Sequence, residues 1–297
     1  MYNEKSYQLH KKHSDEINDQ KLLDSWKKKD TVDYWRHEKM YKNLLPLIES
    51  YPDASWLTVG DGRYGTDANY LLSNGVKNVT ATDLSDTLLI VANRDQFITN
   101  FSAENAEKMS FEDQRFDFVL CKEAYHHFPR PSIALYEMLR VAKRGVVLIE
   151  PMDKNINFGR DNVVVKNIRG FINSLHLLLS GIHKYENFES VGNYIFTVSE
   201  REINKIALAL NLKNVFYKKQ NDCFVEGAED EKREDNGRVF KQIQSKLRLH
   251  NFLCKVGLMQ YGLITSLIMK EEPTNESIVK LKREGYIGYV LPDNPFI

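Results

Sequence analysis

Apolar residues gather along this chain in short runs, which are separated by stretches with helical spacing. Runs rich in apolar and β-branched residues, typical of buried strands, lie at 55–59, 78–83, 97–101, 116–121 and 146–149. Between them apolar residues recur at helical spacing, and Gly75 and Gly145 mark expected helix ends. Strands alternating with helices predict an α/β fold, in which a mostly parallel sheet carries helices on both faces.

The flanking segments extend this prediction. Residues 1–20 are almost wholly polar, whereas 22–48 have amphipathic helical spacing, so we expect an N-terminal arm and helical cap over 1–50. A capping box at Ser199 and Glu202 opens a later helix. A sixth strand is expected to begin at 215, and a seventh spans 261–269 after a helix over 240–254.

These elements predict four parts in one elaborated domain: the cap over 1–50, an α/β core over 51–151, an insertion after strand five over 152–198, and a C-terminal part over 199–297. The last part completes a seven-stranded sheet and ends in an apolar tail. We expect the tail to dock on the chain's own body or on a second copy in a homodimer.

Charge and composition narrow the class of protein. The 297 residues contain 41 Lys and Arg against 41 Asp and Glu, so no strong net field favours nucleic acid or an anionic membrane. Three cysteines without metal-ligand spacing suit a reducing compartment. The polar N-terminus does not resemble a signal peptide, and Lys255 and Gln260 interrupt the most apolar window. We therefore expect a soluble, cytoplasmic protein with neither nucleic acid nor membrane as partner.

A glycine turn follows the first expected strand and gives the first chemical signal. The chain there reads Gly60-Asp61-Gly62-Arg63-Tyr64-Gly65, and the second expected strand ends at Asp83. Such a turn brings backbone N–H groups and a helix N-terminus close to a nucleotide-like ligand. An acid about twenty residues further on can accept hydrogen bonds from a ribose diol.

Five successive segments then carry a family resemblance: VGDGRYG, TATDLS, AENAEKMSF, FDFVLCKEAYHHFPRP and EMLRVAKRGVVLIEP. Together they resemble the motifs of class I S-adenosylmethionine-dependent methyltransferases, in particular the small-molecule group that includes the ubiquinone and menaquinone methyltransferases. The resemblance covers about 55–151. It implies a Rossmann-like fold, S-adenosyl-L-methionine as cofactor and methyl transfer as the reaction, and it does not specify the substrate.

Carried over onto this sequence, the resemblance implies cofactor contacts at Gly60, Asp61, Gly62, Gly65, Asp83, Leu84, Asn105 and Ala106. The glycine turn would line the methionine end, Asp83 would hold the ribose hydroxyls and Leu84 would pack on the adenine. Asn105 would read the adenine amino group, with the backbone of Ala106 beside it. Thr58 departs from the family's pattern because it stands at the usual acidic position of the first motif, and Arg63-Tyr64 suggests a reshaped loop.

Methyl transfer from a sulfonium needs positioning of the acceptor, and a base where the acceptor must lose a proton. The candidates are His127, which the resemblance favours, and His126, both after the fourth strand. A structural role for this pair is the plainer alternative. Glu123 could bond the cofactor's amino group. Adjacent histidines without a carboxylate pair do not predict a metal site.

The expected acceptor pocket draws on residues near the mouth of the site. Its candidates lie in the cap, after strands four and five, and in the insertion: Tyr34, His37, Tyr125, Glu150 and Tyr185. The aromatic residues of the cap could equally pack on the core.

Three functions remain open on the sequence. The first is methyl transfer to an oxygen or nitrogen of a small polar metabolite, such as a sugar or sugar nucleotide. The second is a nicotinamide-dependent oxidoreductase or epimerase, which also uses a glycine turn and an acid after strand two. The third is a non-catalytic methyltransferase-like scaffold, which the departure at Thr58 keeps open.

Overall fold

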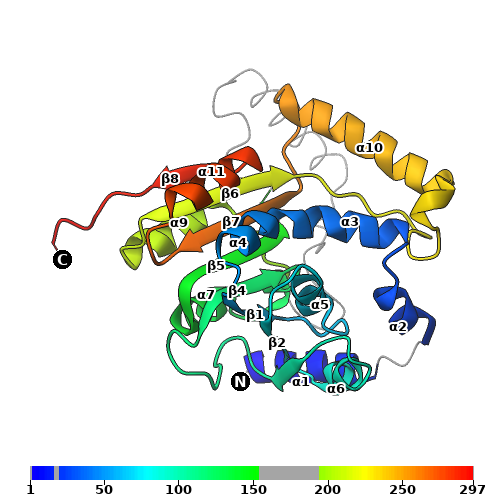
Figure 1. Ribbon diagram of the computed structural model, residues 1–297, viewed down its shortest axis with the longest axis horizontal. Helices are drawn as coiled ribbons and strands as arrows, with labels where there is room; N and C mark the ends of the chain where they lie inside the picture. Colours follow the sequence, from blue (N-terminus) through cyan, green and yellow to red (C-terminus); the bar gives the residue numbers. More distant parts are fainter. Residues whose placement is uncertain (1, 17–19, 154–193, 297) are drawn as a thin grey trace, which may run out of the picture.

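The computed structural model describes residues 2–16, 20–153 and 194–296, and its centre is one sheet of eight strands among these residues (Figure 1). The strand order is β3-β2-β1-β4-β5-β7-β6-β8. The strands are β1 (Ser55–Val59), β2 (Asn78–Asp83), β3 (Asn100–Ala103), β4 (Phe116–Lys122), β5 (Ala142–Pro151), β6 (Asn214–Gln220), β7 (Leu263–Met269) and β8 (Ile287–Val290).

The first five strands are parallel to one another, whereas β7, β6 and β8 add to the sheet through antiparallel pairs. The strand order reverses its direction at β1, between β2 and β4. In an open parallel sheet this switch point leaves a crevice at the carboxyl ends of the strands, where ligands bind. The predicted α/β architecture is confirmed.

Two details differ from the sequence-based expectation. The described residues form eight strands rather than seven, because the apolar tail contributes β8, which pairs with β6. The tail thus docks on the chain's own body. Gly145 lies inside β5 and does not end a helix, because the preceding helix already ends at Val141. A side chain at Gly145 would lie 2.8 Å from the Ile268 carbonyl oxygen on β7. The glycine therefore serves close strand packing.

Helices cover both faces of the sheet. One face packs against α4 (Leu45–Ser50), α5 (Thr66–Ser73), α6 (Thr87–Arg94) and α11 (Asn275–Arg283). The other packs against α7 (Pro131–Val141) and α9 (Glu200–Ala209), where the Ser199 hydroxyl accepts a hydrogen bond from the Glu202 amide, as the predicted capping box requires. Short 3-10 turns are η1 (Lys42–Leu44), η2 (Tyr125–His127) and η3 (Arg233–Asp235).

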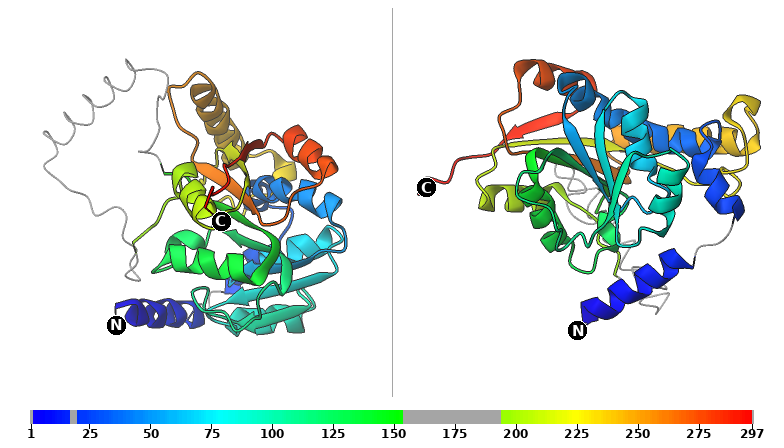
Figure 2. Two further views of the ribbon diagram at one scale, coloured as in Figure 1. Left: turned by 90° about the vertical axis from the view of Figure 1, so that its left-hand side faces the viewer. Right: turned by 60° about the horizontal axis from the view of Figure 1, so that its bottom comes forward.

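The N-terminal cap consists of α1 (Tyr2–Asp15), α2 (Gln20–Lys27) and α3 (Val32–Tyr41), followed by η1 and α4. Helix α1 lies beside α6, as the two views of Figure 2 show, and the Asp15 carboxylate accepts hydrogen bonds from the Ser85 and Thr87 hydroxyls. Helix α3 packs against α10 (Arg238–Lys255) through the rings of Trp35 and Phe240. No helix in the described part of the chain is long and apolar enough to cross a bilayer.

Candidate functional site

A cavity of about 710 Å³ opens at the carboxyl ends of the parallel strands. One wall, here called the core side, consists of residues at or shortly after the carboxyl ends of β1, β2 and β3: Gly60, Gly62, Asp83, Leu84, Asn105 and Ala106. A second wall, here called the cap side, consists of Arg36 and His37 from α3 and Phe224 and Glu229 from the segment after β6. This volume lies in the usual range of small-molecule sites, about 300–1,000 Å³.

The glycine turn forms the floor of the core side. Gly60 has a φ of +78°, and its N–H and that of Asp61 donate to the Thr82 carbonyl oxygen at 2.9 Å. A side chain at Gly60 would lie 2.3 Å from Ala124 Cβ, and one at Gly62 would lie 2.7 Å from the Asp83 carboxyl. Both positions therefore require glycine, because the backbone there approaches the Ala124 side chain and the Asp83 carboxyl too closely to leave room for a Cβ atom.

Asp83 is held by backbone groups and keeps acceptor capacity toward the cavity that it lines. Its Oδ2 accepts from the Gly62 amide at 3.1 Å, and its Oδ1 accepts from the Ser85 amide at 3.0 Å. Burial raises the pKa of the Asp83 carboxyl, and these backbone N–H groups partly offset that shift. Each oxygen has a second lone pair, so the group fits a ribose diol. The core side is thus compatible with an adenosyl cofactor.

Leu84, Asn105 and Ala106 also line the core side. The Oδ1 of Asn105 accepts from the Glu107 amide at 2.9 Å and so helps to shape its own turn. Reading of the adenine by Asn105 and Ala106 stays a prediction.

Asp61 anchors the glycine turn to α5. Its carboxylate accepts from the amides of Asp67 and Ala68, at 3.1 and 2.9 Å, and from the Thr58 hydroxyl at 2.8 Å. Burial and the neighbouring Asp67 raise the pKa of Asp61. Thr58, the departure from the family's pattern, therefore supports the carboxylate that fixes the loop.

The second half of that loop is reshaped, as Arg63-Tyr64 suggests. Tyr64 has a φ of +62° and its ring is buried against Phe97, with centroids 5.3 Å apart. Gly65, expected to line the cavity, lies outside its lining, because the residue packs against Ile98 at the start of α5.

A charged cluster joins the core side to the cap side. The Glu123 carboxylate lies 3.0 Å from Lys122 Nζ and 3.2 Å from His37 Nδ1, and His37 Nε2 lies 3.6 Å from Asp33. Burial alone would raise the pKa of Glu123, but Lys122 and His37 lower it well below its usual range. Glu123 therefore lines the cavity as a carboxylate at neutral pH.

The two histidines of η2 have different surroundings. His126 Nδ1 lies 2.6 Å from Glu150 Oε2, and Glu150 is fully buried. The other Glu150 oxygen accepts from the amides of Ala124 and Tyr125 at 3.0 Å. The His127 ring, 3.9 Å from the His126 ring between centroids, lines the cavity. Glu150 thus fixes the loop and His126, while His127 is the histidine with access to a ligand.

The structure separates the remaining sequence candidates. Tyr125 and Glu150, expected to contact substrate, are fully buried and lie outside the cavity lining, because Tyr125 packs in the hydrophobic core and Glu150 bonds the backbone of the loop after β4. Tyr34 lines a smaller cavity of about 60 Å³ beside α5, which adjoins the main cavity and shares His37 and Lys122 with it. Tyr185 lies outside the described residues. His37 is the substrate candidate that reaches the main cavity.

Sequence reasoning missed much of the lining: Tyr7 and His10 on α1, Arg36 on α3, and Phe224 and Glu229 after β6. Arg36 Nε donates to Asp222 at 3.1 Å across 186 positions of sequence. No local spacing indicates such a contact. The polar pattern of residues 1–20 gave no signal that α1 would lie over the cavity.

The chain is similar to known proteins in sequence and in fold. Residues 57–149 match the family model described as "Methyltransferase domain". A ubiquinone biosynthesis O-methyltransferase of Coxiella burnetii is 30% identical over 120 residues, which cover 37% of this chain and 47% of that protein. The chain thus spans about half the length of the curated relatives it matches.

Among solved structures, a putative sarcosine dimethylglycine methyltransferase from Galdieria sulphuraria is similar in fold. Its TM-score is 0.50 at 15% identity, over 80% of this chain and 86% of that one.

Proposed function

The α/β core of this chain belongs to the class I S-adenosylmethionine-dependent methyltransferases, with S-adenosyl-L-methionine as cofactor, and on this premise we propose that the protein methylates an oxygen or nitrogen of a small polar molecule. The observation that carries the proposal is the single cavity that joins Gly60, Gly62 and Asp83 on the core side to His127 and the cap side. Membership of this family disfavours the oxidoreductase alternative. The division of the chain into cap, core, insertion and C-terminal part belongs to the same proposal.

The cofactor, when bound, supplies a methyl group that its sulfonium has already activated. Gly60 and Gly62 let the backbone approach it, and Asp83 accepts hydrogen bonds from its ribose hydroxyls. The Glu123 carboxylate is available to a positively charged amino group. The chain itself therefore contributes by binding the cofactor and the acceptor and by orienting them, which is the main requirement of methyl transfer.

His127 would take the proton of the acceptor, because it lines the cavity beside the loop that follows β4. His126, held by the buried Glu150 carboxylate, would position the His127 ring. A base aligned in this way contributes about 10²–10⁴-fold to a proton transfer.

The acceptor would bind on the cap side. Its lining combines charged groups, Arg36 and Glu229, with the Phe224 ring, so it suits a polar molecule that carries some apolar surface. A sugar or sugar nucleotide fits this description. The name of the curated relatives makes a hydroxyl on a quinone-like ring the competing acceptor.

The test uses S-adenosylmethionine with a labelled methyl group, purified protein and a cell extract. The extract is heated beforehand so that its own methyltransferases are inactive. The products are separated into water-soluble small molecules, organic-soluble small molecules and macromolecules. Label in the water-soluble fraction supports the proposal, and label in the organic fraction moves the acceptor to a quinone-like lipid. Label only in macromolecules, or no transfer by a protein that binds S-adenosylhomocysteine, contradicts it.

A further inference from the structure

Helix α10 has two apolar faces, although a helix on a protein surface normally has one. Phe240, Ile243 and Leu247 are buried against Val32 and Trp35. Leu249 and Phe252, in the second half of the helix, and Val256, its C-cap, are 56%, 60% and 49% exposed. At about 3.6 residues per turn these three form one stripe, roughly opposite the buried face.

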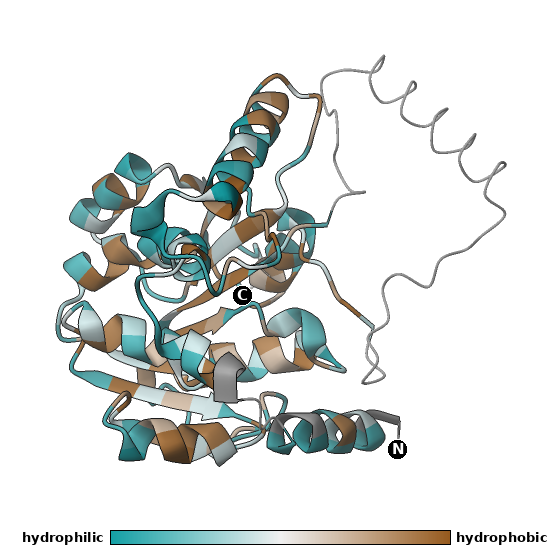
Figure 3. Ribbon diagram, turned by 90° about the vertical axis from the view of Figure 1, so that its right-hand side faces the viewer, coloured by the Kyte–Doolittle hydropathy of each residue, from teal (hydrophilic) through white to brown (hydrophobic). Residues whose placement is uncertain are grey.

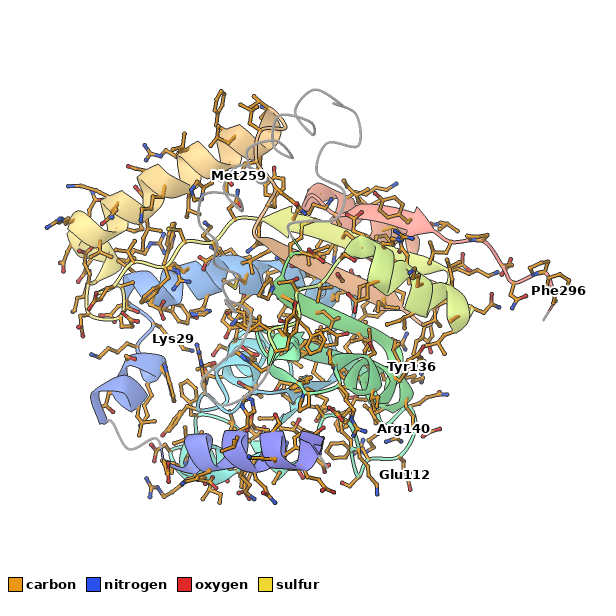
Figure 4. All side chains as sticks on the ribbon, turned by 180° about the vertical axis from the view of Figure 1, so that it is seen from behind. Lys29, Glu112, Tyr136, Arg140, Met259 and Phe296 are labelled. Carbon is orange, nitrogen blue, oxygen red and sulfur yellow. The ribbon has the colours of Figure 1, made fainter. Side chains whose placement is uncertain are left out.

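The stripe of exposed apolar residues continues past the C-terminal end of α10. Leu258, in the turn after α10, is 56% exposed. Figure 3 shows apolar residues among polar ones along α10, and Figure 4 shows side chains that project from α10 away from the body of the protein. Exposed apolar residues that line up in this way indicate a binding surface more often than scattered ones do.

Basic residues flank the stripe. Five exposed cations lie on the helix, at Arg238, Lys241, Lys246, Arg248 and Lys255. None of the five forms an ion pair with any part of the chain that the structure describes. No Asp or Glu occurs anywhere from 238 to 270. The chain is neutral as a whole, so residues 238–270 concentrate positive charge.

We propose that the outer face of α10 binds the surface of a bilayer that contains anionic lipid. Leu249, Phe252, Val256 and Leu258 would enter the boundary between headgroups and acyl chains, while the flanking cations contact the lipid phosphates. An apolar stripe between basic flanks is the pattern of helices that lie in the membrane interface. The proposal differs from the sequence-based expectation of no membrane partner, which rested on the net charge of the whole chain and on the lack of an uninterrupted apolar segment.

Other occupants fit this face less well. In a symmetric contact with a second copy, the same surface faces itself, so the basic flanks would repel one another. A nucleic acid would match the cations but would leave Leu249 and Phe252 against phosphates. An anionic bilayer satisfies both parts of the surface.

The buried face of α10 links this surface to the cavity. Trp35, which packs on Phe240, precedes Arg36 and His37 of the cap side. The lipid surface would therefore hold the helix against which the cap side is built. The inference stands on α10 alone and does not require the proposed reaction.

The test measures co-sedimentation of the full chain with vesicles of phosphatidylcholine, with and without phosphatidylglycerol. We expect binding that requires phosphatidylglycerol, weakens at least about tenfold in high salt and falls at least about tenfold in the variant Leu249→Ser, Phe252→Ser, Val256→Ser. Lys241→Glu with Arg248→Glu should weaken binding as well. The matched control is Val279→Ser, which removes an apolar side chain that is 65% exposed on α11 and should change nothing.

Four results would overturn the proposal. Three concern vesicles: no binding to either kind, equal binding to both kinds, or unchanged binding of the triple variant. The fourth is a wild-type chain that light scattering shows to be a dimer, together with a triple variant that is a monomer. S-adenosylhomocysteine affinity and the thermal midpoint, both unchanged in the triple variant, would show that a loss of vesicle binding does not come from unfolding.

Discussion

The two walls of the cavity are built from different kinds of chain. The core side consists of glycines, Asp83 and short loops at the carboxyl ends of strands in the parallel part of the sheet. The cap side brings together α3 and the segment after β6, which meet through Arg36 and Asp222. A wall made from strand ends presents backbone groups in fixed positions, whereas a wall made from distant segments presents long side chains. The first kind suits a constant cofactor and the second suits a variable acceptor.

This comparison predicts that substitutions on the two walls separate cofactor affinity from turnover. The largest effect is expected for His127→Ala, which removes the proposed base from the cavity. The turnover number should fall about 10²–10⁴-fold. Affinity for S-adenosylhomocysteine, measured by calorimetry, should stay within about twofold.

The matched control for that variant is His250→Ala, a histidine on α10 outside the cavity lining. If the turnover number of His127→Ala with an identified acceptor is unchanged, His127 is not the base and its role is structural.

The glycine turn supplies the next prediction. Gly60→Ala places a side chain 2.3 Å from Ala124 Cβ at a φ of +78°. A φ of this kind costs an alanine about 1–3 kcal/mol, and relief of the overlap with Ala124 displaces the turn that approaches the cofactor, so S-adenosylhomocysteine should bind about 100-fold more weakly. Gly75→Ala has a φ of +92° and open space around it. That control should lose stability with wild-type affinity; equal losses of affinity would show that the turn has no special role.

Asp83 gives a smaller effect with a pH signature. Asp83→Asn replaces charge-assisted hydrogen bonds of about 1.5–3 kcal/mol, so affinity for S-adenosylhomocysteine should fall roughly 10–100-fold. Burial raises the pKa of Asp83, and the ionised form that accepts from hydroxyls disappears as the pH falls through that raised value. Wild-type affinity should therefore decline on acidification from above the ordinary aspartate range, about pH 4.

In Asp83→Asn that part of the pH dependence should vanish, when affinity is measured by calorimetry across the acid range. A wild-type affinity that stays constant down to the ordinary aspartate range would contradict the ribose assignment.

The smallest effect belongs to the cap side. Glu229 lines the cavity, and its carboxylate has no hydrogen bond or ion pair within the described ranges. Glu229→Gln should change the acceptor KM about two- to tenfold, in steady-state kinetics, with cofactor affinity unchanged. Glu226→Gln, an exposed neighbour outside the lining, is the control. A loss of cofactor affinity in Glu229→Gln would contradict the claim that the core side binds the cofactor and the cap side binds the acceptor.

The difference between the two walls also explains which parts of the fold and the site could be predicted from the sequence. Strand runs, the glycine turn and Asp83 are local patterns, so they indicated the parallel sheet and the core side. The contact of Arg36 with Asp222 depends on segments that meet after folding, and no local pattern carries it. Gly145 was interpreted as a helix end because its sequence context cannot reveal the neighbouring strand β7. The burial of Glu150 beneath its loop follows from tertiary packing in the same way.

The most direct test of the account titrates the purified chain with S-adenosylhomocysteine and, in parallel, with NAD, both in a calorimeter. We predict saturable binding of S-adenosylhomocysteine at one site per chain, weakened by Gly60→Ala and not by Glu229→Gln, and no binding of NAD. Binding of NAD in place of S-adenosylhomocysteine, or of neither, would contradict the assignment of the core side.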